Sequence, residues 1–425
     1  MEEISNVEVS NHIPDDIVFS ILSKLSLKSF KRFECVRKSW SLLFDNPYFI
    51  TMYRNHLLTK YCSYYDDHHT TLLLHMIQVP EDEDEQLWNG IGDVFYSLSG
   101  DKFDDIVQID GPKAIKFDDF LEYGDHHDEE EEEEEEEEDG DDNGFDILYP
   151  ISYNGTLNLR RDDFYGKENV ILWNLIGDDF MAIPSHENSH LWDFSAHHYQ
   201  IGYDRVKDDY KIIRCTHYYP KDVSSSCGMS SGHFWEMYSL STNSWKKIDV
   251  EMPHSRWSRE QVYMDGVFHW WDKNETHTCL VSFDFCKESF IVTPIPVDDS
   301  FDSNLVRRHL MVLNGSIAFM LNYTEASIFH ISILGELGIK ESWTKLFIIG
   351  PLPCLEYPIG AGKKGNILFR KKDGELAWFD LSIGMIVDIG VKTQTNDYKM
   401  LFHKESLPIE GIYTNFSSCF HPRDL

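Results

Sequence analysis

The chain has 425 residues and a mass of 49.8 kDa, enough for roughly two to four domains, or for a small module followed by one large all-β unit. Hydrophobic residues make up 42% and aromatic residues 14%, so the chain can bury a sizeable core and is not disordered as a whole. Its formal charge of −35 argues against nonspecific binding to DNA or RNA phosphates, since Lys and Arg supply that affinity. We therefore expect no nucleic acid among its partners.

The first residues, Met1-Glu2-Glu3-Ile4, are acidic and lack an apolar run, so they do not predict a secretory signal. The sequence has no run of about 18 apolar residues, which argues against a membrane-spanning helix. The eight cysteines are scattered and include no Cys-x-x-Cys pair, which favours reduced thiols over a disulfide framework. These features predict a protein of the cytoplasm, the nucleus or both, with no membrane partner.

Residues 13–60 predict a group of short helices. Pro14 suits the first position of a helix, where its missing N–H costs nothing. Apolar side chains then recur at helical spacing in three successive segments. They are Ile17, Ile21, Leu22 and Leu25 in the first, Leu27, Phe30, Phe33 and Val36 in the second, and Trp40, Leu43 and Phe44 in the third. A further helix is predicted through Phe49–Leu58.

Three helices in about 40 residues are too small to bury all of these side chains among themselves. The surplus must pack either on the large domain that follows or on a partner protein. Residues 11–60 hold eight Lys and Arg against four Asp and Glu, so this segment is basic in an otherwise acidic chain. A basic, apolar, helical module favours docking of an acidic partner.

The same segment resembles a plant F-box. The matching runs are Ile13-Pro14-Asp15-Asp16-Ile17-Val18, Ile21-Leu22-Ser23-Lys24-Leu25, the stretch from Leu27 to Trp40, and the stretch from Leu42 to Phe49. Ser26 stands where the family usually has Pro. The resemblance implies a three-helix module in residues 1–60 that docks on the small Skp-type adaptor of a cullin–RING ubiquitin ligase. The residues expected at the adaptor interface are Pro14, Ile17, Leu22, Leu25, Leu27, Phe30, Val36 and Trp40.

An acidic run interrupts the second part of the chain. Fifteen carboxylates lie between Asp125 and Asp142, including ten consecutive glutamates, Glu129–Glu138. Such a run repels itself, so residues 125–142 predict a disordered loop. Apolar alternation resumes directly at Phe145-Asp146-Ile147-Leu148, which indicates an insertion within one domain rather than a boundary. An alternative hypothesis is that the run makes the chain an acidic nuclear chaperone of basic proteins such as histones.

Residues 61–425 predict a large all-β domain. Asn154-Gly155, Asp265-Gly266, Asn314-Gly315 and Asp373-Gly374 each precede alternating apolar residues, as in β-hairpins with type I′ turns. A loose repeat of about 45–50 residues, anchored at Tyr238, Phe283 and Phe379, is typical of propeller blades such as kelch. We expect an irregular β-propeller, with a pair of β-sandwiches as the alternative.

Several runs in this part also resemble the plant F-box-associated domain, a propeller-like partner of the F-box. They are Leu172-Trp173-Asn174, Ile201-Gly202-Tyr203-Asp204, the stretches from Asp208 to Ile213 and from Ser239 to Trp245, Phe283-Asp284, and the stretch from Glu341 to Lys345. The resemblance implies recognition of a substrate protein, whose identity does not transfer because the family is diverse. The chain would then be the substrate-recognition subunit of a Skp–cullin–F-box (SCF) ubiquitin ligase.

Two short motifs have the residue spacing of enzyme motifs but lack the secondary structure that those motifs need after them. Gly228-Met229-Ser230-Ser231-Gly232 needs a following helix to act as a nucleophile elbow, and a strand-like run follows instead. The stretch Gly360–Gly365 has the spacing of a dinucleotide-binding loop, yet it also precedes a strand-like run. The histidine pairs at 68–69, 126–127 and 197–198 lack helical or cysteine partners for a metal. We therefore expect a non-catalytic protein without cofactor or metal.

Overall fold

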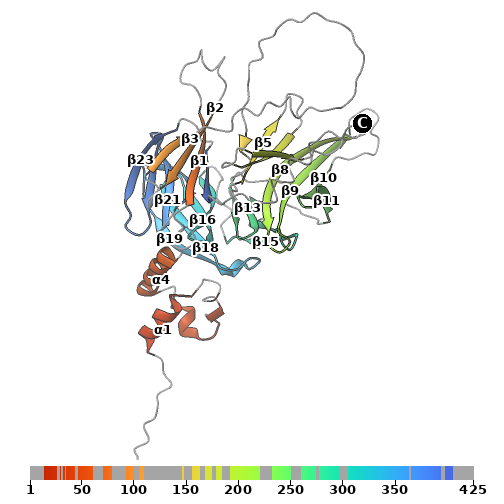
Figure 1. Cartoon of the computed structure of the whole chain (residues 1–425). Coiled ribbons are helices and arrows are strands. Elements are labelled where there is room, and N and C mark those ends of the chain that lie inside the picture. The colour runs from red at the N-terminus through yellow and green to blue at the C-terminus, as the bar shows by residue number, and fades with distance from the viewer. Residues whose placement is uncertain are drawn as a thin grey trace, which may run out of the picture.

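The computed structural model describes residues 14–25, 29, 32–33, 35–43, 46–60, 70–78, 92–99, 105–109, 146–147, 156–162, 168–174, 179–183, 192–220, 232–249, 260–273, 277–296, 305–362, 365–393 and 398–404. The helices gather at the N-terminal end, below a large body of β-sheets (Figure 1). This division agrees with the small all-α module and large all-β domain predicted from the sequence.

The helical module (residues 14–60) contains α1 (Asp15–Leu22), α3 (Lys38–Ser41) and α4 (Pro47–Lys60). Pro14 is the N-cap of α1, with φ of −55° and ψ of 143°, so it lies one residue before the first helical position that the sequence predicted for it. Asn46 caps α4, because its side-chain Oδ1 accepts the N–H groups of Tyr48 at 2.9 Å and Phe49 at 3.2 Å. Pro47 then occupies the first helical turn.

Within the described residues the strands form six antiparallel sheets of four strands each. The first contains β24 (Tyr398–Lys404), β1 (Thr70–Gln78), β2 (Gly92–Ser99) and β3 (Asp105–Ile109), and the second β4 (Asp146–Ile147), β5 (Thr156–Asp162), β6 (Glu168–Asn174) and β7 (Asp179–Ile183). The third contains β8 (Trp192–Asp204), β9 (Asp209–Pro220), β10 (Gly232–Ser239) and β11 (Ser244–Ile248), and the fourth β12 (Gln261–Met264), β13 (Val267–Lys273), β14 (Thr278–Asp284) and β15 (Ser289–Pro294). The fifth contains β16 (Val306–Leu313), β17 (Ser316–Tyr323), β18 (Ile328–Leu334) and β19 (Trp343–Ile349), and the sixth β20 (Leu355–Ala361), β21 (Asn366–Lys371), β22 (Glu375–Asp380) and β23 (Ile386–Lys392). A short 3-10 helix, η4 (Lys340–Ser342), lies between β18 and β19.

The sheets are the blades of a β-propeller. Neighbouring sheets meet through the strand at one edge of each sheet, β12 with β16, β16 with β20, and β20 with β24. These edge strands therefore lie nearest the centre. Strand β24 pairs antiparallel with β1, from Thr70 opposite Lys404 to Met76 opposite Tyr398. Strands from the two ends of the described chain therefore share one blade, which closes the ring. The propeller prediction is confirmed, and the β-sandwich alternative is wrong.

Left-handed residues make two of the four hairpin turns that the sequence predicted; at Asp373-Gly374, between β21 and β22, only Gly374 has a positive φ, of 83°, so this turn is not of type I′. In the β12–β13 turn Asp265 and Gly266 have φ of 54° and 83°, and in the β16–β17 turn Asn314 and Gly315 have φ of 47° and 70°. Both central residues need positive φ in a type I′ turn, which Asn, Asp and Gly tolerate. Asn154-Gly155 lies outside the described residues.

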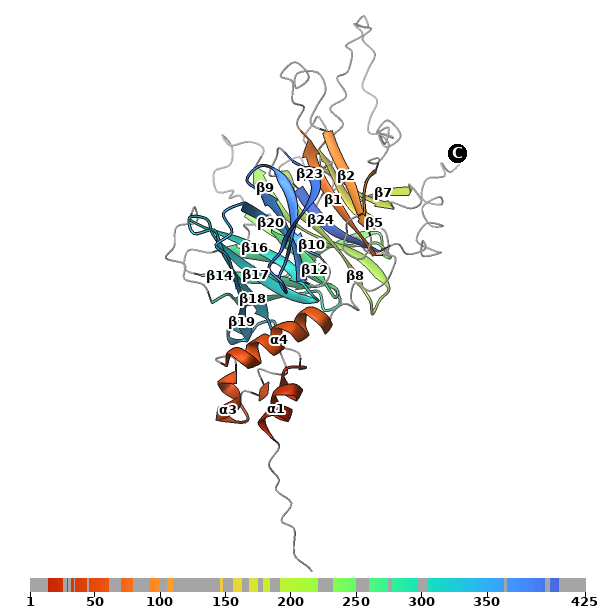
Figure 2. The same cartoon turned by 90° about the vertical axis from the view of Figure 1, so that its left-hand side faces the viewer.

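The helical module and the propeller share one buried apolar core. It joins side chains of α1 and α4 to the fifth and sixth blades, and Figure 2 shows α4 lying against the lower end of β18 and β19. Its members include Val18, Leu22, Leu43, Phe49 and Tyr53 from the module and Met311, Phe329, Leu346, Phe347 and Phe369 from the propeller. Part of the apolar surplus of the helices therefore packs on the large domain.

The two faces of the propeller are defined by the strand directions. We call proximal the face with the β18–β19 loop, where Glu336 approaches Arg32 of the helical module at 3.5 Å. Strand β16 ends at this face, because β18 runs in the same direction as β16. The opposite face, where β16 begins, is the distal face. Strand β20 also begins there, since the backbone N–H of Leu352 just before it bonds to Ser327 in the β17–β18 turn.

Candidate functional site

The structure divides the predicted adaptor-binding residues into two groups. Pro14, Ile17 and Val36 are exposed, with Ile17 at 47% and Val36 at 68%. Leu22 is buried, and Leu25 and Trp40 pack partly buried against the same core. Leu27 and Phe30 lie outside the described residues. The assignment of these eight residues to an adaptor interface stays a prediction.

Helix α1 has an inner and an outer apolar face. Residues four positions apart are neighbours on a helix. Val18 and Leu22 form the buried pair, whereas Ile17 and the 53% exposed Ile21 form a pair on the outside. A docking surface on α1 would therefore use Ile21 in place of Leu22. The four-residue spacing between Ile17 and Ile21 is visible in the sequence. Which side of the apolar stripe of α1 faces solvent, however, depends on where the propeller packs.

Further exposed apolar side chains extend the outer surface of the module. They are Phe33, Leu42 and Tyr48. Single exposed apolar residues are common on proteins, but several on one small module indicate a surface for another protein. We call Ile17, Ile21, Phe33, Val36, Leu42 and Tyr48 the outer apolar surface.

The inner side of the module is held by aromatic packing. Phe49 of α4 is fully buried, and its ring lies edge-on to Phe19 with centroids 5.6 Å apart. Tyr53, one turn later, stacks on Phe49 at 6.3 Å. Because these residues belong to the core shared with the propeller, they fix the outer apolar surface relative to the blades.

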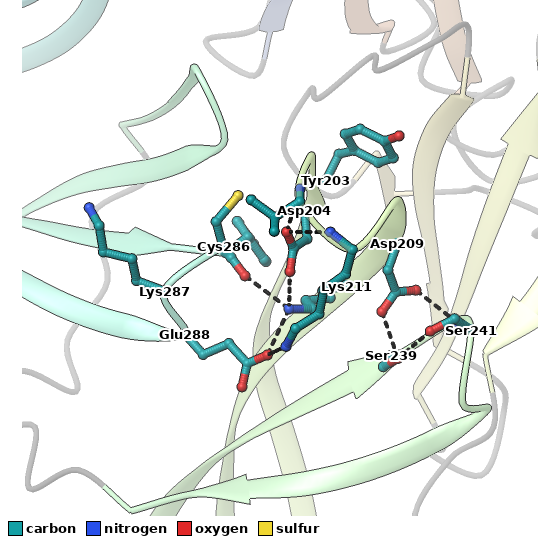
Figure 3. Close-up of polar contacts among 12 residues, drawn as sticks. Tyr203, Asp204, Asp209, Lys211, Ser239, Ser241, Cys286, Lys287 and Glu288 are labelled. Atoms are coloured by element: carbon teal, nitrogen blue, oxygen red, sulfur yellow. Dashed lines mark hydrogen bonds and ion pairs between the residues drawn. The ribbon is translucent and has the colours of Figure 1, made fainter.

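A buried ion-pair cluster joins the third and fourth blades (Figure 3). The Lys211 ammonium group on β9 lies 2.6 Å from Oδ2 of Asp204, at the end of β8. It also donates to the carbonyl of Phe285 at 3.0 Å and to Oε1 of Glu288 at 2.7 Å, both in the β14–β15 turn. Lys211 and Asp204 are almost fully buried, so the contacts replace the water that both charges lose.

The cluster shifts the pKa values of all three groups. Burial alone would raise the pKa of Asp204, but hydrogen bonds from Lys211 and two backbone N–H groups lower it to about 2. Burial is likewise outweighed at Glu288, where three lysines lower the pKa to about 2. The pKa of Lys211 is raised, because the two carboxylates outweigh its burial. All three groups are charged at neutral pH.

The runs around residues 201–204 and 208–213, which suggested a family, build this blade junction. Gly202 leaves room for the ring of Phe285, since a Cβ there would lie 2.1 Å from Cδ2 of that ring. Asp209 accepts hydrogen bonds from the Ser239 hydroxyl at 2.7 Å and the Ser241 N–H at 2.9 Å. These polar residues hold blades and turns together.

Each of the two enzyme-like motifs is followed by a strand. Strand β20 ends at Ala361, and strand β21 begins at Asn366 and pairs antiparallel with it, so the stretch 360–365 is followed by a strand and not by the helix that a dinucleotide-binding loop needs. Strand β10 begins at Gly232, where a nucleophile elbow would need a helix. Residues 228–231 and the acidic run 125–142 lie outside the described residues, so the chaperone hypothesis stays a prediction.

No group of His, Cys, Asp or Glu suited to a metal ion occurs in the part of the chain that the structure describes. In the same residues, no helix is long and apolar enough to cross a membrane.

Comparison with known proteins connects the propeller to a family. Residues 127–408 match the F-box associated beta propeller domain. Similar proteins include the F-box protein CPR1 of Arabidopsis thaliana, 25% identical over 47% of this chain and 53% of that protein, so the chain spans about half the length of this relative. F-box only protein 8 of Arabidopsis thaliana is also 25% identical, over 68% of this chain and 81% of that protein.

Solved structures add little. Dipeptidyl peptidase 4 of Porphyromonas gingivalis has a TM-score of 0.35 and 9% identity, over 77% of this chain and 45% of that chain. A likeness of this size supports no argument about function.

Proposed function

The chain belongs to the F-box associated beta propeller family, and we propose that it is the substrate-recognition subunit of an SCF ubiquitin ligase. In this proposal residues 1–60 bind a Skp-type adaptor, through which the cullin and the RING protein are reached. Residues 61–425 bind a target protein of unknown identity. The complex would act in the cytoplasm, the nucleus or both.

The observation that carries the proposal is the outer apolar surface. Ile17, Ile21 and Val36 are exposed on a module whose inner side is already buried against the propeller. The remaining apolar area is therefore open to a second protein. Burying a side chain of the Leu or Ile class contributes about 1.5–3 kcal/mol, so a few such residues can support a stable contact.

The proposed mechanism is proximity. A target held on the propeller, and a ubiquitin-conjugating enzyme recruited through the adaptor, react at a raised effective concentration. The packing of Phe49 and Tyr53 into the shared core supports this mechanism, because a rigid connection fixes the distance between the two binding partners. In such a complex the chain itself carries out no bond chemistry.

The proposal can be tested by co-expressing the full chain with a Skp-type adaptor and measuring their affinity. We expect a stable complex, and we expect the double variant Ile17→Asp/Val36→Asp to weaken it at least about tenfold, which corresponds to about 1.4 kcal/mol. A matched control is Val387→Asp on β23, which changes an equally exposed apolar residue of the propeller.

Circular dichroism must show that the double variant keeps its helices, since otherwise the loss would reflect unfolding. Full adaptor binding by the folded double variant would contradict the assignment of the outer apolar surface. Failure of the unaltered chain to bind any Skp-type adaptor would contradict the proposed function itself.

A further inference from the structure

A polar cluster joins the first strands of three successive blades. Glu260 directly precedes β12, His309 lies on β16 and Tyr357 lies on β20. Oε1 of Glu260 accepts the Tyr357 hydroxyl and lies 3.0 Å from Nδ1 of His309. The rings of His309 and Tyr357 meet edge-on, with centroids 4.7 Å apart. Because these strands surround the centre of the propeller, the cluster lies beside its axis.

His309 presents a hydrogen-bond acceptor in this cluster. Its side chain is 2% exposed, and its Nε2 has no hydrogen-bond partner among the described residues. Since Nδ1 faces a carboxylate oxygen, the proton of a neutral ring belongs on Nδ1, and Nε2 then carries a lone pair. Buried polar atoms usually have partners, so this atom can accept a hydrogen bond from a donor outside the chain.

A second buried acceptor lies on the other side of β12. Gln200 of β8 is fully buried, and its amide nitrogen donates to Oε1 of Gln261, the residue next to Glu260. Its own Oε1 has no hydrogen-bond partner within the described residues. The start of β12 is therefore flanked by two buried acceptors and by the Glu260 carboxylate.

The cluster belongs to the distal face. Tyr357 and His309 lie in the first halves of β20 and β16, which begin at that face, and Glu260 lies before the first residue of β12. The helical module packs at the opposite, proximal face (Figure 2). The helical module therefore does not cover the face on which this cluster lies.

We propose that this site, formed by Glu260, His309 and Gln200, binds an arginine side chain of the target protein. The inference rests on the proposed function, because it names the chemistry by which the target is recognised. A guanidinium group has five N–H donors and a permanent charge, and can satisfy a carboxylate together with further acceptors. A chain with a formal charge of −35 also favours a basic partner.

The test uses the full chain in complex with the adaptor and a labelled peptide, Gly-Ser-Gly-Arg-Gly-Ser-Gly, capped at both ends. Its counterpart has citrulline, which keeps the shape of arginine without the charge. We expect the arginine peptide to bind at least about tenfold more tightly than the citrulline peptide, since a charged hydrogen bond on a carboxylate is lost. We expect Glu260→Gln to weaken arginine binding by a similar factor.

The matched control is Glu325→Gln, which removes the same charge from an exposed position in the distal β17–β18 turn. This variant should bind the arginine peptide as the unaltered chain does, and it also controls for general attraction to an acidic protein. Gln200→Met, which leaves the contact between Glu260 and His309 in place, should weaken binding at least about twofold.

Equal binding of the two peptides, or unchanged arginine binding by a folded Glu260→Gln variant, would overturn the inference. Such results would indicate that the cluster only stabilises the contact between neighbouring blades. Adaptor capture is measured in the same preparation. A chain that binds the adaptor but not the arginine peptide would overturn this inference and leave the proposed function standing. A chain that binds the arginine peptide but does not capture the adaptor would contradict the proposed function and leave the arginine site standing.

Discussion

The ammonium group of Lys211 and the carboxylate of Asp204 lie 2.6 Å apart in the junction between two blades, almost completely screened from water. A single buried charge is costly, and this pair is tolerated because each group has further partners. Lys211 also contacts Glu288 and the Phe285 carbonyl of the next blade, and Asp204 also accepts the backbone N–H groups of Val206 and Lys207.

Removing the positive charge should destabilise the propeller strongly. Lys211→Met leaves Asp204 buried without its counter-charge, and breaking a buried pair in this way costs about 3–5 kcal/mol. Urea unfolding followed by tryptophan fluorescence measures the effect. Lys287→Met is the matched control, because it removes the same charge from an exposed side chain in the neighbouring turn, paired with Asp284.

The double variant Asp204→Asn/Lys211→Met should recover part of the lost stability, because it leaves no buried charge unpaired. If Lys211→Met unfolds at the same urea concentration as Lys287→Met, the ion pair does not hold the blades together.

The same cluster predicts how stability depends on acid. The pKa values of Asp204 and Glu288 are about 2 in the folded chain, below their ordinary values of 3.8 and 4.5. Their contribution to the free energy of unfolding is complete above about pH 5 and is lost as pH falls toward 2, since the unfolded chain takes up protons first. The slope of unfolding free energy against pH between 5 and 2 should therefore be smaller in Asp204→Asn. An unchanged slope would contradict the low pKa of Asp204.

Gly202 should resist even the smallest side chain. A Cβ would overlap the Phe285 ring, at 2.1 Å from its Cδ2, and overpacking of this kind costs about 1–3 kcal/mol. We expect Gly202→Ala to lower the melting temperature, and Phe285→Leu to reduce the cost of the alanine when the two changes are combined. Strictly additive effects of the two changes would indicate that Gly202 and Phe285 do not compete for space.

Thiol reactivity should separate the cysteines by burial. Burial raises the pKa of Cys215 to about 12, so almost none of it is thiolate at pH 8, whereas Cys35 and Cys354 are exposed. Brief treatment of the native chain with iodoacetamide should label Cys35 and Cys354 and spare Cys215, as read by peptide mass spectrometry. Equal labelling of all three would show that the third blade opens readily.

Local features of the fold were predictable from sequence because their causes are local. Asp265-Gly266 and Asn314-Gly315 predicted hairpins, since few residues tolerate positive φ at both positions. It was harder to predict which face of α1 is buried. The stripe of Ile17, Ile21 and Leu22 is wide, and which edge is buried depends on a propeller segment about 300 residues away in the chain.

The site at Glu260 was missed, although a signal for it existed. Glu260 and His309 are 49 residues apart, and Tyr357 follows His309 after a further 48, so the three occupy equivalent positions in successive blades. Their spacing equals the repeat of about 45–50 residues that indicated the propeller. Different residue types hide this equivalence, because a site at the centre needs different side chains from each blade.

The last prediction concerns the core shared by the module and the propeller. Phe49 of α4 is fully buried among Phe19, Tyr53 and the apolar residues of the fifth and sixth blades. Phe49→Ala should cost about 3–5 kcal/mol, because it removes apolar contacts and leaves a cavity. Since the core is continuous, the change should lower the urea midpoint of the propeller as well as that of the helices. Propeller unfolding is followed by tryptophan fluorescence and helix loss by circular dichroism.

Tyr48→Ala is the matched control for this change, since Tyr48 is the preceding residue of the same helix and points outward with 67% exposure. Its stability should stay within about 0.5 kcal/mol of the unaltered chain. If module and blades unfold as one unit, both probes should report a single transition in Phe49→Ala, at a lower urea concentration than in the unaltered chain. Loss of helix at low urea with an unchanged fluorescence midpoint would contradict this coupling, and would make the predicted domain boundary at residues 60–61 an energetic boundary as well.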